Sequence, residues 1–225
     1  MPGETVDTRA AQRPARVTLR GRYVEVVPID AAKHGAELYP ALGGAENAAL
    51  WTYMFDGPFT DRGSFDAYLA LRAVTDDPCC FAIIDAATKK ALGMAVLMRI
   101  EPLHRVIEIG GIIFSRELQR TRWATEAMYL LARYVFDELG YRRYEWKCNA
   151  LHTGSRHAAL RLGFSFEGIF RHHMIIKGRT RDTAWYAMID ADWPAMKAGF
   201  ERWLAPENFD AAGRQRTALT LRAPT

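Results

Sequence analysis

The segment His104–Ser115 constrains the fold most, because it is typical of a strand that is apolar on both faces. Its apolar residues alternate between the faces, with Val106, Ile112 and Phe114 on one and Ile107, Ile109 and Ile113 on the other. A strand covered on both faces belongs in the centre of a sheet with helices on each side. Gly110–Gly111 interrupts this strand, which indicates either a simple bend or a bulge approached closely by a ligand.

The order of the other elements predicts an α/β (α+β) protein with a central mixed sheet of six to seven strands. Apolar alternation and turn residues predict strands over residues 17–29, 80–85, 91–100, 104–115, 142–148, 164–176 and 183–189. Helical spacing and capping residues predict helices over residues 30–42, 61–73, 124–139, 153–162 and 192–204. One domain over residues 17–205 accounts for this order. We expect residues 1–16 and 206–225 to be flexible or loosely docked tails.

Composition and charge exclude several classes of protein. No apolar run reaches the roughly 18 residues needed to cross a bilayer, so we expect no membrane partner. Cys79, Cys80 and Cys148 lack zinc-ligand spacing and cannot form a set of disulfides, which predicts no metal site and a reduced, cytoplasmic protein. The net charge of +4 comes from the two ends, +3 from residues 1–22 and +1 from residues 206–225. The neutral body argues against a nucleic-acid partner.

The loop after the central strand has the composition of an anion site. Residues 108–127 read as a strand, a short arginine-rich loop and the start of a long helix, whose free N–H groups and dipole favour negative charge. Gln119, Arg120, Thr121 and Arg122 add donors and two guanidinium groups, which suit a pyrophosphate. An ordinary loop with surface arginines is the alternative that the spacing leaves open.

Residues 119–124 read Gln-Arg-Thr-Arg-Trp-Ala and resemble the acyl-CoA pyrophosphate loop of GNAT-type N-acetyltransferases, usually written Gln/Arg-x-x-Gly-x-Gly/Ala. The order of elements from residue 17 to about residue 190 is similar to that family as well. Leu118–Ala127, Asn149–Phe164 and Phe166–Gly168 are most similar to its ribosomal-protein N-acetyltransferase branch, which usually has Asn-x-x-Ser ahead of a helix ending in Gly-Phe.

The resemblance implies acetyl-CoA as cosubstrate and a sheet splayed between the strands at 104–115 and 142–148, with pantetheine against the first of them. The cofactor-binding residues that it implies are Ile112, Ile113, Phe114, Gln119, Arg120, Thr121, Arg122, Trp123, Ala124, Thr125, His152 and Ser155. Arg122 stands where the family has Gly, and we expect its guanidinium to contact the phosphates rather than block them. His152 stands where the branch has Asn, which changes the ionisation of that corner.

Acetyl transfer to an amine requires a base for the amine, a donor for the developing oxyanion and an acid for the departing thiolate. Glu108 is the expected base, directly or through water, and a carboxylate paired with Arg105 or another basic group is the alternative. A backbone N–H near Phe114 is the expected oxyanion donor. Ser155 resembles the serine that protonates the sulfur in the branch, or else simply belongs to the first turn of a helix.

Two histidines and an aromatic cluster are the candidates for the acceptor side. His172 and His173 point to opposite faces of one strand, so His173 is a second candidate base, with a solvent-facing role as the alternative. Trp51, Tyr53 and Phe55 lie where the family builds its acceptor wall, and they are either substrate-binding or core residues.

The leading hypothesis is an acetyl-CoA-dependent N-acetyltransferase in which a primary amine attacks the thioester directly. The resemblance suggests a protein N-terminus as acceptor, with small amines as the alternative, and implies a homodimer. One rival is a non-catalytic acyl-CoA-binding module, in which Arg122 and His152 mark the loss of catalysis. Another is a ribosome-surface or nucleic-acid partner bound through the basic tails, whose binding would collapse with salt.

Overall fold

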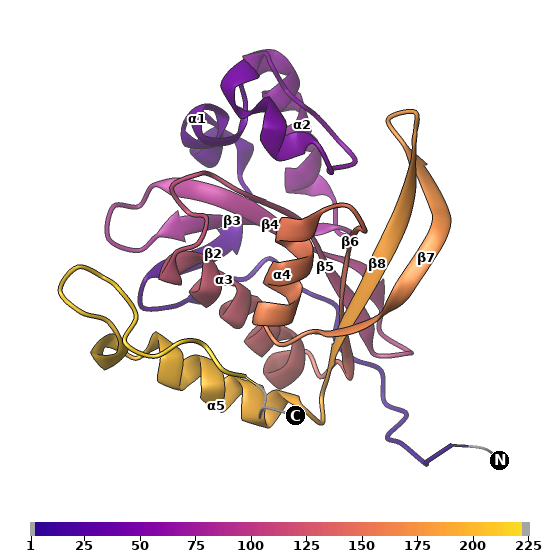
Figure 1. Ribbon diagram of the computed structural model, residues 1–225. Helices are drawn as coiled ribbons and strands as arrows, with labels where there is room; N and C mark the ends of the chain where they lie inside the picture. The colour runs from indigo at the N-terminus through magenta and orange to yellow at the C-terminus, as the bar shows by residue number, and fades with distance from the viewer. Residues whose placement is uncertain (1–2, 222–225) are drawn as a thin grey trace.

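Eight strands form one mixed sheet in the computed structural model, which describes residues 3–221. They are β1 (Leu19–Arg20), β2 (Val24–Pro28), β3 (Cys79–Asp85), β4 (Ala91–Glu101), β5 (Val106–Phe114), β6 (Arg143–Asn149), β7 (Ser165–Ile176) and β8 (Arg179–Ile189). Their order in the sheet is β1-β2-β3-β4-β5-β6-β8-β7, and every neighbouring pair is antiparallel except β5 and β6. Figure 1 shows the sheet between layers of helices, as the two apolar faces of the central strand predict.

The first predicted strand is divided into β1 and β2, and this gives eight strands rather than six to seven. A turn at Gly21 separates them, and the buried carboxylate of Glu126 binds its backbone. The N–H groups of Arg22, Tyr23 and Val24 donate to that carboxylate at 2.6–2.9 Å. A Cβ on Gly21 would lie 2.5 Å from the carboxylate, so the turn requires glycine. The sequence shows the glycine but not the glutamate, which comes from a distant helix.

Helices close two separate apolar cores on the two faces of the sheet. One face is covered by α1 (Ala31–Leu42), the 3₁₀ helix η1 (Ala45–Trp51) and α2 (Arg62–Val74). The other is covered by α3 (Arg122–Arg133), which continues into the π-helical turn η2 (Tyr134–Glu138), by α4 (Thr153–Arg161), and by α5 (Trp193–Leu204) with the short η3 (Pro206–Asn208) after it. Neighbouring β3 residues such as Phe81 and Ala82 belong to different cores, as strand alternation requires.

The central strand β5 parts from its parallel neighbour halfway along. β5 and β6 pair only as far as Ile109 and Trp146, although they continue to Phe114 and Asn149. Against β4, β5 gains one residue at Gly111, whose φ is +53°. The glycine pair therefore forms a bulge, as one of the two readings expected. We call the region between the unpaired ends of β5 and β6 the splay, and it confirms the splayed sheet that the resemblance implied.

β7 and β8 form a long hairpin that rises beside α2 (Figure 1). The turn is Lys177–Gly178, with φ of +50° and +71°, which is typical of a two-residue type I′ turn. It is shorter than the turn predicted over residues 177–181, so Arg181 lies within β8. At the tip, Lys177 Nζ donates to the carbonyl oxygens of Trp51 and Asp56, both at 2.9 Å. These bonds tie the hairpin to the loop that precedes α2.

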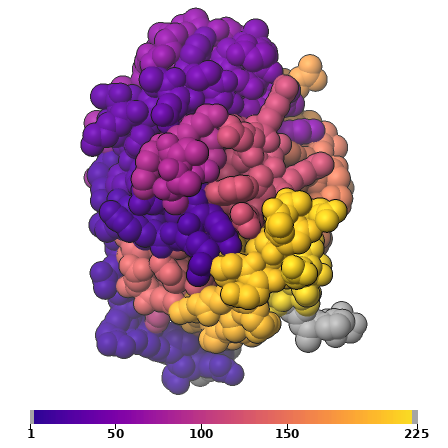
Figure 2. Space-filling model, turned by 90° about the vertical axis from the view of Figure 1, so that its left-hand side faces the viewer, coloured from indigo at the N-terminus to yellow at the C-terminus, as the bar shows by residue number. Residues whose placement is uncertain are grey.

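Parts of both terminal segments contact the rest of the protein, although residues 3–10 and 211–218 are exposed. The backbone N–H groups of Ala11 and Gln12 donate to carbonyl oxygens outside the N-terminal segment, at 3.0 and 2.9 Å. In the C-terminal segment, Phe209 packs against the core. Figure 2 shows this segment, in yellow, lying on the body of the molecule. Residues 1–2 and 222–225 of the predicted tails lie outside the described residues.

Candidate active site

The β5 edge at the splay carries backbone groups that no strand pairs with in the described chain. The Ser115 N–H donates to Leu92 O on the β4 side at 3.0 Å, so the N–H and C=O of the preceding residue, Phe114, face the splay. The Phe114 carbonyl oxygen accepts from the side-chain amide of Gln119 at 2.8 Å. Residues 112–114, predicted to bind pantetheine, therefore lie where an extended ligand can hydrogen-bond to strand backbone.

The N-terminus of α3 follows directly on this edge. Thr121 is its N-cap, and the Thr121 hydroxyl accepts from the Ala124 N–H at 3.2 Å. Arg120, just before the cap, has a left-handed φ of +61°. The first helical N–H groups, those of Arg122 and Trp123, point out along the helix axis towards the loop. Together with the helix dipole, these amides are suited to bind an anion, and we call this place the anion site.

Two of the predicted cofactor residues support the start of α3. Thr125 is buried, and its hydroxyl donates to Thr121 O at 3.3 Å while accepting from Arg161 at 3.1 Å. Trp123 packs against the core and meets the Tyr23 ring edge-on, with centroids 6.4 Å apart. Their side chains therefore fix the loop and the helix start, leaving the backbone amides for a ligand.

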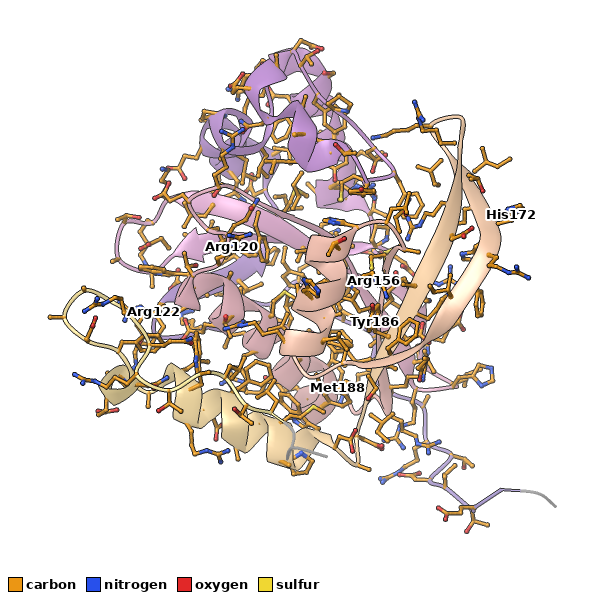
Figure 3. The ribbon with its side chains drawn as sticks, viewed as in Figure 1. Arg120, Arg122, Arg156, His172, Tyr186 and Met188 are labelled. Carbon is orange, nitrogen blue, oxygen red and sulfur yellow. The ribbon has the colours of Figure 1, made fainter. Side chains whose placement is uncertain are left out.

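The Arg122 guanidinium is turned away from this anion site, contrary to the expectation that it contacts the phosphates. Its central carbon lies 4.4 Å from the centre of the Tyr23 ring, 5.1 Å from that of Trp123 and 5.0 Å from that of Phe209. Figure 3 shows Arg122 beside the C-terminal loop and apart from Arg120. The negative faces of the rings attract the cation. Arg122 therefore fastens the C-terminal segment, and Arg120 is the guanidinium that remains at the loop.

Matched substitutions of these two arginines separate the two roles. We expect Arg120→Ala to weaken CoA binding by about tenfold, as loss of a charged hydrogen bond usually does, and Arg122→Ala to change it by less than about twofold. Calorimetric titration with CoA measures both affinities. Arg122→Ala is expected to lower the melting temperature instead, because it removes the cation–π contacts with the C-terminal segment. Equal losses of affinity in the two variants would contradict this assignment.

The start of α4, just after β6, holds two candidate residues, His152 and Ser155. His152 is the N-cap, with Nδ1 accepting from the Ser155 N–H at 3.4 Å, and its ring stacks on Tyr53 with centroids 4.4 Å apart. Burial lowers the pKa of His152, which keeps Nδ1 free to accept. The Ser155 hydroxyl accepts from Trp146 Nε1 at 3.0 Å. Burial raises the pKa of the neighbouring Cys148 thiol, although a hydrogen bond from Ser155 opposes it. Because the Ser155 hydroxyl is the acceptor in its bond with Trp146, its own proton can be donated to another group.

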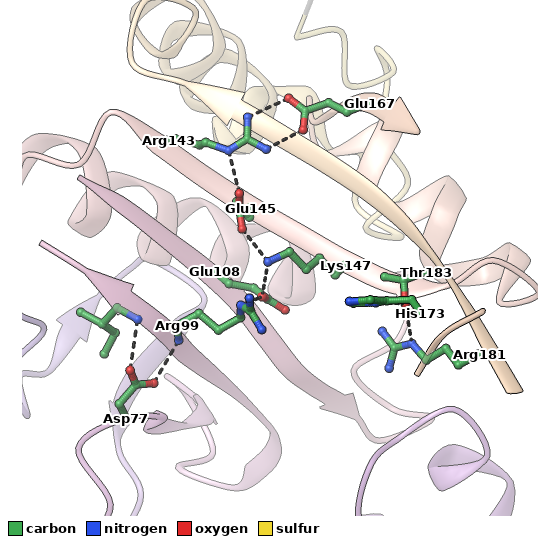
Figure 4. Close-up of polar contacts among 11 residues, drawn as sticks. Asp77, Arg99, Glu108, Arg143, Glu145, Lys147, Glu167, His173, Arg181 and Thr183 are labelled. Carbon is green, nitrogen blue, oxygen red and sulfur yellow. Dashed lines mark hydrogen bonds and ion pairs between the residues drawn. The ribbon is translucent and has the colours of Figure 1, made fainter. Parts of the chain in front are cut away.

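Glu108 lies buried on the opposite face of the sheet, in a row of alternating charges (Figure 4). Lys147 Nζ donates to Glu108 Oε2 at 2.9 Å and pairs with Glu145 at 2.6 Å, and the Lys147 side chain is only 6% exposed. Arg143 then joins Glu145 at 2.7 Å to Glu167, also at 2.7 Å. The row crosses four strands and links charges that would otherwise be buried alone.

Glu108 is paired with basic groups, as the alternative reading expected, but its partners are Lys147 and Arg99 rather than Arg105. Arg99 approaches Glu108 at 3.4 Å from a left-handed position in β4, with a φ of +49°. Asp77 holds that position by accepting from the Arg99 N–H at 3.0 Å. Burial raises the pKa of Glu108, and the two cations only partly oppose this. A carboxylate with a raised pKa is suited to accept a proton from an amine.

A wide bulge in β7 brings His173 to the same face as Glu108. His172 has a left-handed φ of +51° and donates its N–H to Asp182 at 2.7 Å, which turns the next side chain towards the hairpin's inner side. His173 Nδ1 then lies 3.0 Å from Thr183 Oγ1. Figure 4 shows His173 on the hairpin, apart from Glu108. His173 is exposed whereas Glu108 is buried, so the two candidate bases occupy different environments.

The three aromatic residues predicted for the acceptor wall divide between core and surface. Trp51 is 0% exposed, and its Nε1 donates to Leu42 O at 2.7 Å, so it is a core residue rather than a substrate contact. Tyr53 stacks on the N-cap of α4. Phe55 is 49% exposed, and its ring centre lies 4.9 Å from the guanidinium carbon of Arg181. Tyr53 and Phe55 stay candidates for the acceptor wall.

Sequence reasoning missed two buried cations on this face, Lys147 and Arg181. Arg143, Glu145 and Lys147 alternate with apolar residues along β6, which sets all three charges on one face. A row of charges on a strand that is otherwise buried is the signal that would have identified Lys147. Arg181 falls in the predicted turn, where no burial is expected, so the sequence offers no comparable signal.

Other kinds of site find no support in residues 3–221. Across this part of the chain, no group of three or more His, Cys, Asp and Glu side chains is arranged to hold a metal ion. None of the helices described there combines the length and hydropathy that a membrane span requires. Cys79, Cys80 and Cys148 are free and buried.

The chain matches the family model of an acetyltransferase (GNAT) domain over residues 28–165, more than half of its length. It is 47% identical to a GCN5-related N-acetyltransferase from Brucella melitensis, with a TM-score of 0.91 over 94% of this chain and 96% of that chain. It is 37% identical to a probable GNAT-family acetyltransferase from Chromobacterium violaceum, with a TM-score of 0.80 over 87% and 98%. A comparison with curated proteins found no match.

A more distant structure shares the fold alone. It is microcin C7 self-immunity acetyltransferase MccE in complex with acetyl-CoA and AMP, 19% identical, with a TM-score of 0.65 over 75% of this chain and 93% of that chain. The family model and the two nearer structures are all described as acetyltransferases of the GNAT or GCN5-related family. The chain therefore belongs to the GNAT family of acetyl-CoA-dependent N-acetyltransferases.

Proposed function

We propose that this N-acetyltransferase moves the acetyl group of acetyl-CoA to a primary amine, either a protein N-terminus or a small amine, which attacks the thioester directly. The observation that carries the proposal is a pair of proton-handling groups on opposite faces of the sheet at the splay. Glu108 lies one residue before the β5–β6 pairing ends, on the Lys147 face. Ser155 lies on the other face, against Trp146. A base and an acid thus flank the splay from its two sides.

The acceptor amine must lose a proton before it attacks, since the pKa of an α-amine is about 8 and that of a lysine about 10. The Glu108 carboxylate accepts this proton, directly or through a water molecule. Because burial raises its pKa, Glu108 is a stronger base than a surface carboxylate. Lys147 and Arg99 stabilise the ionised form that must be present before each turnover.

Acetyl-CoA, when bound, supplies an activated thioester carbonyl. The N–H groups of Arg122 and Trp123 at the start of α3, with the Arg120 side chain, fit its diphosphate. The Phe114 N–H, which faces the splay, donates to the carbonyl oxygen as negative charge develops there. Ser155, oriented by its bond from Trp146, passes a proton to the departing sulfur and regains one from the attacking nitrogen, which loses its second proton as the amide forms. This route needs no covalent enzyme intermediate.

Three side chains border the proposed acceptor side. Tyr53 and Phe55 border it from the loop before α2, and His173 borders it from the β7–β8 hairpin. The resemblance of Asn149–Phe164 and Phe166–Gly168 to the ribosomal-protein branch favours a protein N-terminus within this class. The exposed His173 is a second proton acceptor on this side, in contact with Thr183 rather than with Glu108.

Release of free thiol tests the proposal. The protein is mixed with acetyl-CoA and a panel of primary amines and N-terminal peptides, and the free thiol of CoA is followed with time. We expect turnover with at least one acceptor, and a slower rate for Ser155→Ala with unchanged CoA affinity, because only the proton donor is removed. CoA binding without thiol release from any acceptor would favour the non-catalytic binding module. Absence of both would reject that module as well.

A further inference from the structure

The sheet face that carries Glu108 holds the buried cation Arg181 beside the row of charges. The charged row on this face is neutral, because its three cations and three carboxylates are linked by contacts of 2.6–3.4 Å. Its members are Arg99, Glu108, Lys147, Glu145, Arg143 and Glu167. On β8, Trp185 lies against Lys147, with Nζ 3.9 Å from the ring centre. Arg181 has the same parity as Trp185 on β8 and adds a positive charge to this face.

Arg181 is buried, and no carboxylate of residues 3–221 forms an ion pair with it. It is 6% exposed, its Nε donates to Thr183 Oγ1 at 3.2 Å, and its guanidinium lies over the Phe55 ring. Within residues 3–221 it forms no ion pair, that is, no carboxylate oxygen lies within 4.0 Å of its nitrogens. The two terminal nitrogens of its planar fork therefore have donor capacity that the described protein does not use.

The acidic groups around Arg181 are engaged elsewhere. Glu108, on β5, already belongs to the neutral row. Asp56, in the loop before α2, pairs with Arg72 at 2.5 Å. Asp182, next to Arg181 on β8, points to the other face and accepts from a backbone N–H of β7. None of these carboxylates forms an ion pair with Arg181, although the charge of Glu108 acts on it from a distance.

A buried cation without a partner destabilises a fold, since its desolvation is not offset by an opposite charge. Burial lowers the pKa of Arg181, and the charge of Glu108 only partly opposes this, although a guanidinium stays protonated. A second donor on the same face is also left without an acceptor in the described chain, the buried Nε1 of Trp185. Both features are explained if a ligand with an acidic group completes this face when it binds.

We propose that Arg181 binds a carboxylate carried by the acceptor, so that the enzyme acetylates amines that have an acidic group nearby. The inference rests on the proposed transfer of acetyl to an amine at the splay. One guanidinium balances one negative charge, and its planar fork matches the two oxygens of a carboxylate. Thr183 fixes the plane of the fork and Phe55 covers it, so Arg181 is preorganised for this contact.

Two matched pairs of acceptors test this assignment in the thiol-release assay. Glutamate α-amide and glutamine α-amide represent small amines, and peptide amides that begin Ser-Glu or Ser-Gln represent protein N-termini. We expect the acidic member of at least one pair to have a kcat/KM at least about tenfold higher, as a charged hydrogen bond provides. The pair that shows the difference identifies the source of the carboxylate.

Arg181→Gln is expected to abolish this preference by raising KM for the acidic acceptor about tenfold, with little change for the neutral one. Arg181→Lys is expected to retain part of the preference. The melting temperature of Arg181→Gln should stay equal or rise, because an uncompensated buried charge is removed. Equal kcat/KM within both pairs, or a Gln variant that melts lower and loses both acceptors equally, would overturn the proposal.

A binding measurement separates this inference from failure of the proposed function. If no amine releases thiol, calorimetry with N-acetylglutamate α-amide and N-acetylglutamine α-amide, in the presence of CoA, still compares the two side chains. Tighter binding of the acidic compound that Arg181→Gln removes would support the Arg181 site. Equal binding of the two compounds would reject it.

Discussion

Replacing Glu108 by Gln is expected to lower kcat at pH 7 by about a hundredfold, the scale that a positioned general base contributes. The amide keeps the shape of the side chain but cannot take the proton of the attacking amine. The deficit should shrink as pH rises, because more of the amine is then already deprotonated. Thiol-release measurements of kcat and kcat/KM across the pH range, with CoA affinity measured in parallel, check this result.

Glu145→Gln is the matched control, because it removes a carboxylate from the same lysine without touching the splay. We expect it to change kcat far less than Glu108→Gln does. In the wild type, kcat/KM should fall on the acidic side at a pH above that of an ordinary carboxyl group, since burial raises the pKa of Glu108 and its ionised form is the base. A constant ratio of Glu108→Gln to wild-type rate at every pH would remove Glu108 from the mechanism.

Lys147→Met is expected to lower the free energy of unfolding by about 3–5 kcal/mol, the scale for a buried ion pair that loses one partner. The variant leaves Glu108 and Glu145 buried beside each other without the cation that now lies between them. Because Lys147 lowers the pKa of Glu108, its loss should raise that pKa further and move the acidic limb of kcat/KM to higher pH. Urea unfolding and the pH profile measure the two effects.

Lys197→Met provides the exposed counterpart. Lys197 pairs with Asp137 at 2.6 Å, but its side chain is 36% exposed, so we expect a loss of less than about 1 kcal/mol. Combining Lys147→Met with Glu108→Gln should destabilise by less than the sum of the single changes, because the double variant carries one unpaired carboxylate fewer. A loss for Lys147→Met no larger than that for Lys197→Met would show that the row of charges is not buried in solution.

The parts of the site that depend on one stretch of sequence could be predicted. The central strand follows from alternation within residues 104–115, and the glycine pair indicates a bulge or a bend, of which the structure has the bulge. The position of Glu108 near the splay could be predicted for the same reason, because Glu108 lies two residues before the glycine pair on the same strand. The anion site at the start of α3 likewise depends on a single loop and the helix after it.

The parts that depend on distant residues could not be predicted. Arg122 lies in the loop and helix start predicted for the phosphates. Its side chain instead packs on Tyr23 and Phe209, which come from opposite ends of the sequence. The burial of Arg181 could not be predicted, because it depends on a hairpin turn of only two residues. The short turn places Arg181 within β8 and under Phe55. Pairwise attractions of this kind leave no periodic pattern in the chain.

Side chains in the first two turns of α3 contact segments near both ends of the sequence. The Glu126 carboxylate accepts hydrogen bonds from the backbone that follows β1, and the Arg122 guanidinium makes a cation–π contact with Phe209 beyond α5. The amides of the proposed diphosphate site are therefore held in place by contacts within the folded protein. We therefore expect a diphosphate that binds there to cause little further ordering of the chain, which favours its affinity.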